Sequence, residues 1–84
     1  MDINQKIHQG IDCLTKNKPS EAEKIFKSLL NKDPMNPEIN HFLGISYQLL
    51  NQIKEAVIYY EKTIKIKPDF AEAHKNLGNM FYRL

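Results

Sequence analysis

Hydrophobic residues recur along this chain three and four positions apart, the spacing that gathers side chains on one face of an α-helix. The C-terminal stretch HKNLGNMFYRL is typical, with apolar residues at Leu77, Met80, Phe81 and Leu84. Polar or proline-containing turns interrupt the pattern, which predicts helices at roughly 3–16, 19–31, 37–50, 54–66 and 71–83. The sequence therefore predicts an all-α protein.

Two residue types mark the predicted helix ends. Asn17 and Asn51 stand where the first and third helices should end, and asparagine tolerates the left-handed backbone of a helix C-cap. Pro34 and Pro68 follow the second and fourth helices, because proline disfavours helical backbone at the residue before it. The connections are short, and short connections make consecutive helices antiparallel neighbours. We therefore expect two helical hairpins and a fifth helix, stacked in one direction.

A 34-residue period runs through the sequence, because Gly10, Gly44 and Gly78 are spaced by this interval. The same interval separates four pairs of similar residues: Ala22 and Ala56, Phe26 and Tyr60, Leu43 and Leu77, and Tyr47 and Phe81. Small residues let two helices approach closely where they cross, and aromatic rings fill the space beside the crossing. Each period is therefore predicted to be one pair of packed helices.

These residues resemble the signature of the tetratricopeptide repeat (TPR) family, whose helix–turn–helix unit has about 34 residues. The second unit, 37–70, matches at Leu43, Gly44, Tyr47, Ala56, Tyr60 and Pro68. The half-unit 71–84 matches at Leu77, Gly78 and Phe81, and the first unit, 3–36, at Gly10, Ala22, Phe26 and Pro34. The first unit departs from the signature at Lys6 and Gln9, where the family prefers large apolar residues. The resemblance implies one domain, 1–84, folded as a right-handed αα-hairpin solenoid of two units plus one helix.

Composition excludes several classes of protein. The net charge of +2 on 84 residues is far from the strongly basic balance of a dedicated nucleic-acid binder, so no nucleic-acid partner is predicted. Cys13 is the single cysteine, which excludes an internal disulfide and a cysteine-based zinc site. No apolar run suggests a signal peptide or a membrane span, so we expect a cytoplasmic protein without a membrane partner.

No pattern in the sequence predicts catalysis. There is no glycine-rich loop after a strand, and the serines have no neighbouring motif that would activate a nucleophile. His8, His41 and His74 are 33 residues apart, one less than the repeat, so they drift around successive helices. We expect these histidines at the surface or at interfaces rather than on one metal ion. The chain is predicted to be neither an enzyme nor a binder of a metal or cofactor.

In the TPR family the first helix of each unit lines a concave groove, and repeat solenoids bind ligands along such surfaces. The resemblance therefore places a peptide-binding groove on Ile7, Ile11, Leu14, His41, Phe42, Ile45, Gln48, Leu49, Glu72, Lys75, Asn76, Asn79 and Arg83. This wall is apolar at its N-terminal end and polar at its C-terminal end, which suits an extended or helical peptide with apolar anchors. The alternative is that Ile7, Ile11, Phe42 and Leu49 are partly core between adjacent units.

Two kinds of TPR ligand can be compared with these positions. Co-chaperone repeats grip acidic chaperone tails with a clamp of Lys, Asn and Arg, but the matching residues here are Ile7, Ile11, Phe42, Glu72 and Asn76. No such clamp is predicted. The segment DFAEAHKNLGN is similar to repeats in O-linked N-acetylglucosamine transferases, where a ladder of asparagines holds a peptide backbone; Asn76 and Asn79 match that ladder.

The resemblance predicts a non-enzymatic module that binds a protein or peptide. An alternative comes from SEAEKIF and KDPMNPEINHFLG, which resemble N-terminal repeats preceding bacterial glycosyltransferase or sulfotransferase domains. The chain would then recruit substrates for an enzyme domain beyond Leu84; a structural spacer is a third possibility. Because no helix follows the fifth, Leu77 and Phe81 are expected to be uncovered and to support self-association, whereas Met80 and Leu84 pack back on the preceding unit.

Overall fold

The computed structural model describes residues 2–83 of the 84-residue chain. It contains the helices α1 (Ile3–Thr15), α2 (Pro19–Lys32), α3 (Pro37–Leu49), α4 (Ile53–Ile66) and α5 (Ala71–Arg83). Each predicted helix is confirmed, with its ends within one residue of those expected, and residues 2–83 contain no strand. The predicted contact of Leu84 lies outside the described residues.

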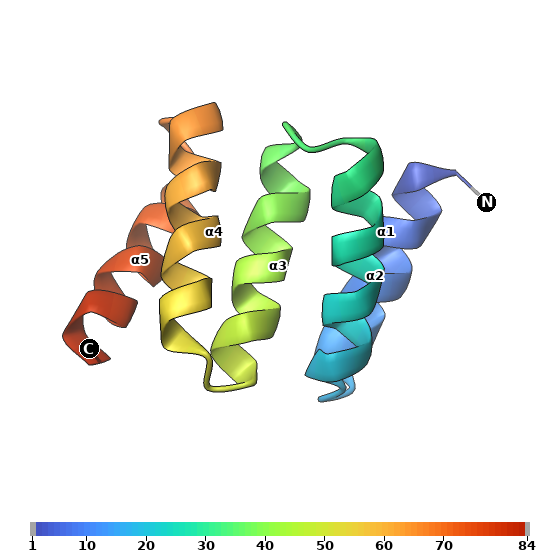
Figure 1. Ribbon diagram of the computed structural model, residues 1–84, viewed down its shortest axis with the longest axis horizontal. Coiled ribbons are helices and arrows are strands. Elements are labelled where there is room, and N and C mark those ends of the chain that lie inside the picture. The colour runs from blue at the N-terminus through green and yellow to red at the C-terminus, as the bar shows by residue number, and fades with distance from the viewer. Residues whose placement is uncertain (1, 84) are drawn as a thin grey trace.

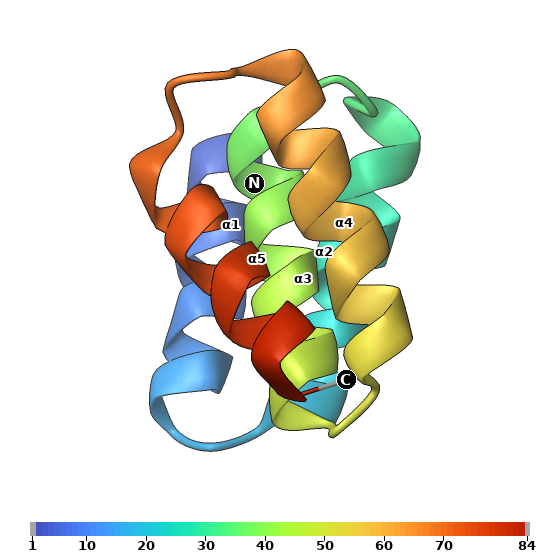
Figure 2. The same ribbon diagram turned by 90° about the vertical axis from the view of Figure 1, so that its left-hand side faces the viewer.

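Consecutive helices pack side by side, α1 on α2, α2 on α3, α3 on α4 and α4 on α5 (Figure 1). In Figure 2, α1 and α5 lie along one side of the molecule and α2 and α4 along the other, with α3 between them. The α2–α3 and α4–α5 connections therefore lie at one end of the stack, and the α1–α2 and α3–α4 turns lie at the other (Figure 1). The result is an elongated array of helical hairpins that measures 37 × 26 × 18 Å.

The residues predicted to end helices do so. Asn17 and Asn51 adopt the left-handed backbone conformation, with φ angles of 59° and 61°, just after α1 and α3. Asparagine is one of the few residues with a side chain that occupies this region readily. The helices α2 and α4 end two residues before Pro34 and Pro68, which cannot continue them. Local chemistry therefore sets the length of each hairpin.

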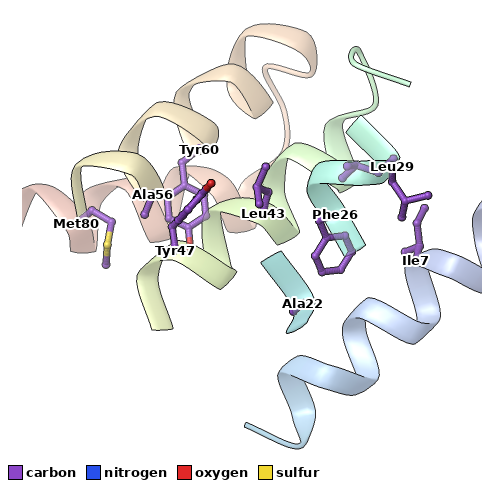
Figure 3. Packing of buried hydrophobic residues seen from close by; sticks show 10 residues of the cluster. Ile7, Ala22, Phe26, Leu29, Leu43, Tyr47, Ala56, Tyr60 and Met80 are labelled. Atoms are coloured by element: carbon purple, nitrogen blue, oxygen red, sulfur yellow. The ribbon is translucent and has the colours of Figure 1, made fainter. Parts of the chain in front are cut away.

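Each hairpin closes where a glycine meets an aromatic ring. A Cβ atom added to Gly10 would lie 2.5 Å from the Phe26 ring, and one added to Gly44 would lie 2.7 Å from the Tyr60 ring. Both rings are completely buried (Figure 3). Contacts of this length leave no room for a methyl group, so these crossings require glycine.

The fifth helix is covered on one side only. Met80 is completely buried against the second hairpin, as predicted, whereas Phe81 is 54% exposed and Leu77 is half-buried. Nothing lies within 4 Å of the position where a Cβ of Gly78 would be. The fifth helix therefore keeps the pattern of a repeat unit without a second helix of its own within residues 2–83.

Candidate functional site

The residues predicted to bind a peptide lie on α1, α3 and α5, the first helices of the two units and the half-unit. We call the surface that they form the α1–α3–α5 face. Its exposed residues are Leu49, Glu72, Lys75, Asn79 and Arg83, and its half-buried residues are Ile11, Leu14, Phe42, Ile45, Gln48 and Asn76. The exposed part is polar and lies mostly on α5, whereas the apolar part lies on α1 and α3.

Two of the predicted residues are buried instead. Ile7 is 6% exposed and belongs to the hydrophobic core, which agrees with the alternative of packing between units. Ile11 and Phe42 are half-buried against the same core, and the Phe42 ring stacks on the Phe26 ring at 5.5 Å. His41 is 1% exposed, so its prediction as a surface or groove residue is wrong, whereas His8 and His74 are exposed as expected.

Gln48 connects the α1–α3–α5 face to the core. Its Oε1 atom accepts a hydrogen bond of 2.6 Å from the hydroxyl of the buried Tyr60. Burial raises the pKa of Tyr60, which keeps the hydroxyl protonated and able to donate. The bond holds the Gln48 amide in one orientation and leaves its nitrogen, which carries two donors, for a ligand. At the far end of α5, the Arg83 guanidinium donates to Asn51 Oδ1 at 3.2 Å.

A cleft of about 450 Å³ opens at the end of this face where α3 and α5 begin. The lining residues come from the start of α3, the α4–α5 connection and the start of α5, and are Glu38, His41, Phe42, Lys67, Asp69, Phe70, Ala71 and Glu72. We call this the acidic cleft, because three of these residues are carboxylates and one is a lysine. It joins Phe42 and Glu72 of the predicted groove to residues that the prediction missed.

His41 forms the floor of the acidic cleft within a cage of aromatic rings. The ring centroids of Phe42, Tyr60 and Phe70 lie 5.6, 5.6 and 4.8 Å from that of the imidazole. Neither ring nitrogen has a hydrogen-bond partner within residues 2–83, and the Glu72 carboxylate is 3.6 Å from Nε2. A buried polar group left without a partner costs about 1–3 kcal/mol of stability.

Burial also controls the charge of His41. Removal from water disfavours the imidazolium and lowers the pKa of His41 below its ordinary value of 6.5, although the nearby Glu72 carboxylate acts in the opposite direction. The ring is therefore neutral at pH 7, with one nitrogen as a donor and the other as an acceptor. Within the acidic cleft His41 offers hydrogen bonds rather than positive charge.

Two equivalent connections hold the walls of the acidic cleft in place. Before α3, the Asn40 amide donates to the carbonyl oxygen of Pro34 at 3.1 Å. Before α5, the His74 ring nitrogen lies 2.6 Å from the carbonyl oxygen of Pro68. These two side chains stand 34 residues apart and each bonds the proline carbonyl six residues earlier. The repeat thus fixes both loops by the same bond made with different side chains.

The missed residues carried a signal in the sequence. Glu38 and Glu72 are 34 residues apart, as are Asn36 and Phe70, so a carboxylate occupies the same repeat position in successive units. Asp69 lies in the turn before α5 and has no such counterpart, since residue 35 is a methionine. The period could therefore have identified Glu38, but only the three-dimensional arrangement brings the α4–α5 connection to it.

A second cleft, of about 520 Å³, lies on the other side of the molecule near the α2–α3 connection. Its lining is Leu30, Pro34, Met35, Asn40, Lys62, Lys65 and Ile66, which makes it apolar with two lysines. We call it the basic cleft. Its charge is opposite to that of the acidic cleft, so the two should select different ligands.

Two searches of the described residues bear on other kinds of site. Within residues 2–83, no three His, Cys, Asp or Glu side chains come together in a group that could hold a metal ion. In the same part of the chain, no helix has the length and apolar character that crossing a membrane requires.

Comparison with known proteins gives the class of the fold. Residues 49–84 match the family model for the TPR repeat. This match and the five helices make the fold an all-α solenoid of TPR type.

Among individual proteins, the chain is 30% identical over 80 residues to the mitochondrial import receptor subunit TOM70 of Rattus norvegicus and of Mus musculus. It is 28% identical over 80 residues to the protein of the same name from Homo sapiens. These alignments cover 95% of this chain but only 13% of each relative. The likeness therefore concerns one repeat segment of much longer proteins.

Proposed function

We propose that this chain is a non-enzymatic protein-interaction module that receives a peptide or a partner helix across the α1–α3–α5 face. The observation that carries the proposal is the juxtaposition of fixed and free groups on that face. Gln48 is held by Tyr60, while the neighbouring α5 presents exposed Lys75 and Asn79 and half-buried Asn76. A prearranged polar surface beside apolar anchors loses little entropy when a peptide binds.

The comparisons support a binding role. The matched family model is the TPR repeat, and repeat solenoids use their extended surfaces for binding. The similar segments belong to proteins named import receptor subunits, and a receptor is a binding protein. The accessory module of a glycosyltransferase or sulfotransferase stays an alternative prediction, and so does a cytoplasmic location.

The affinity should be modest because two and a half units offer a small surface. The lower end of specific interfaces, below about 1,200 Å², corresponds to weak and transient complexes. An acidic chaperone tail should not bind, because Glu72 places a negative charge where a clamp needs a positive one and Ile7 is buried. Calorimetry with such a tail peptide checks this, and a micromolar dissociation constant would contradict it.

The proposal can be tested with peptides selected from a displayed random library against the 84-residue chain. Binding of the selected peptides is then measured by calorimetry to the parent and to a Gln48→Ala/Asn76→Ala variant. We expect the double substitution to weaken binding at least tenfold, or about 1.4 kcal/mol. The matched control is Lys62→Ala/Lys65→Ala in the basic cleft, which should leave the affinity unchanged. Peptides that tolerate the first pair of changes and lose affinity with the second would move the binding surface to the basic cleft.

A further inference from the structure

The acidic cleft carries negative charge that the described part of the chain does not neutralise. Its carboxylates are Glu38, Asp69 and Glu72, and its one basic side chain is Lys67. None of these carboxylates forms an ion pair with a lysine or arginine within residues 2–83; Glu72 contacts only the neutral His41. Carboxylates held close together without a counter-ion attract a cation.

A cation already lies at the edge of the acidic cleft. The Lys67 ammonium is 5.8 Å from the centroid of the Phe70 ring, within the range of a cation–π contact. Phe42 and Phe70 supply aromatic surface on either side of His41. Aromatic faces beside carboxylates form an environment for an ammonium or guanidinium group. The position of Lys67 shows that this environment attracts positive charge even within the chain itself.

The floor of the cleft adds an unused polar group. His41 is 1% exposed, and its two ring nitrogens have no hydrogen-bond partner in the described residues. Because Glu72 is 80% exposed at its side chain and 3.6 Å from Nε2, a small movement of this carboxylate would let it bridge His41 and a ligand. The imidazole can therefore support a bound group without repelling it.

The carboxylates have a structural role as well, but that role does not account for the whole site. Glu38 and Glu72 lie in the first turns of α3 and α5, where negative charge is favourable with the helix dipole. This explanation covers neither Asp69, which lies before α5, nor the buried histidine without a partner. The coincidence of these groups in one cleft indicates a ligand site.

We propose that the acidic cleft binds the basic side chain, lysine or arginine, of a partner peptide that lies across the α1–α3–α5 face. The ligand cation would contact the Phe70 and Phe42 rings and bond to the carboxylates of Glu38 and Glu72, displacing Lys67. This proposal rests on the proposed function and adds a specificity to it. It selects partners of a charge opposite to that of an acidic tail.

The test uses small probes, so it does not require an identified partner. N-acetyl-arginine amide is titrated into the 84-residue chain, and the amide chemical shifts of Glu38, Phe70 and Glu72 are followed by NMR. We expect saturable shifts with a dissociation constant on the order of 1 mM. N-acetyl-citrulline amide has nearly the same shape without the charge and should bind at least about fivefold more weakly, as expected for loss of charge-assisted contacts. The signal of Met35 in the basic cleft should not move.

Three variants sharpen the result. Glu38→Gln/Glu72→Gln should weaken the arginine probe at least about fivefold, because both charged acceptors are lost. Glu21→Gln/Glu55→Gln changes the net charge equally at the opposite end of the stack and should leave binding unchanged. Lys67→Gln removes the internal competitor and should strengthen binding about twofold to threefold.

Either of two outcomes would overturn the proposal. The first is equal binding of the arginine and citrulline probes, which would mean that charge is not recognised. The second is tighter binding of N-acetyl-glutamate amide, which would mean that the helix N-termini dominate over the carboxylates. Both results leave the peptide experiment on Gln48 and Asn76 intact, so failure of this specificity is distinguishable from failure of the proposed function.

Discussion

Gly44 and Gly78 occupy the same position in successive repeat units, yet their surroundings differ completely. A Cβ atom at Gly44 would meet the Tyr60 ring at 2.7 Å, whereas one at Gly78 would meet nothing within 4 Å. The difference comes from α4, which covers α3, while no helix covers α5 in the same way within residues 2–83. The same residue is therefore a packing requirement in one unit and an exposed helix position in the next.

Two neighbouring pairs of residues follow the glycines. Leu43 is completely buried, whereas its counterpart Leu77 is half-buried. Tyr47 is 7% exposed, whereas its counterpart Phe81 is 54% exposed. The repeat pattern thus specifies which side chains are suited to burial, and the following helix decides whether they are buried. This contrast between a closed unit and an open half-unit can be tested by substitution.

The largest difference should come from truncating an aromatic residue on each side of the comparison. Tyr60→Ala removes a completely buried ring and its hydrogen bond to Gln48, and should lower the free energy of unfolding by about 3–5 kcal/mol. Phe81→Ala removes a half-exposed ring and should lower it by about 1 kcal/mol or less. Urea unfolding followed by circular dichroism measures both. Similar losses for the two variants would mean that α5 is covered after all.

The glycines themselves give the next effect. Gly44→Leu should destabilise the chain by about 1–3 kcal/mol, because the added side chain must displace the buried Tyr60 ring. Gly78→Leu meets open space and replaces a poor helix former, so it should stabilise α5 by up to about 1 kcal/mol. Thermal melts of the two variants at the same low concentration should shift in opposite directions. A loss of stability with Gly78→Leu would show that its surface is packed.

The accuracy of the sequence-based predictions follows the same division. Helix ends depend on neighbouring residues such as Asn51 and Pro68, and these were predicted within one residue. The crossing of Gly44 and Tyr60 was predictable because the period repeats it in the first hairpin. Covalent neighbours and a regular period are properties that a sequence displays directly.

The acidic cleft was not predictable in the same way. His41 is a polar residue on a helix whose neighbours in sequence gave no reason for burial. Its burial results from rings on three segments, with Tyr60 on α4 and Phe70 in the α4–α5 connection. Asp69 joins the cleft because that connection folds back towards α3. Such a site depends on how units stack, which the period does not encode residue by residue.

The histidines offer a third test, in which a buried position in the closed unit is compared with an exposed one in the half-unit. The lowered pKa of His41 means that the unfolded chain binds a proton more readily than the folded chain as the pH falls below about 6.5. Stability should therefore decrease between about pH 7.5 and pH 5.5. Glu72, the charged group in contact with His41, reduces this effect without reversing its direction.

Melting temperatures across this pH range check the expectation. His41→Leu removes the titrating group and should flatten the dependence of the melting temperature on pH. His74→Gln, an exposed position on α5, serves as the matched control and should retain the slope of the parent. An unchanged slope in His41→Leu would assign the pH dependence to other groups.

The smallest effect on stability, but the most direct test of the open half-unit, is self-association. Phe81 is 54% exposed and Tyr82 is 95% exposed at the end of α5, beside the half-buried Leu77. Two copies of this face can cover each other around a two-fold axis, the commonest symmetry of homo-oligomers. We expect a dissociation constant of tens of micromolar, an order of magnitude typical of weak interfaces. At a free protein concentration near this constant, association would stabilise the fold by only about 0.4 kcal/mol.

Sedimentation of the 84-residue polypeptide beside its Phe81→Glu variant distinguishes the possibilities. The parent should be heavier than a monomer at about 100 µM, a concentration above the expected dissociation constant. The variant should remain monomeric, because two carboxylates would face each other across the two-fold axis in an apolar interface. Lys62→Glu changes the charge of the basic cleft and should leave the association unaffected. If the parent sediments as a monomer at millimolar concentration, the exposed face of α5 is stable in water by itself. The difference between the closed unit and the half-unit would then be one of packing alone.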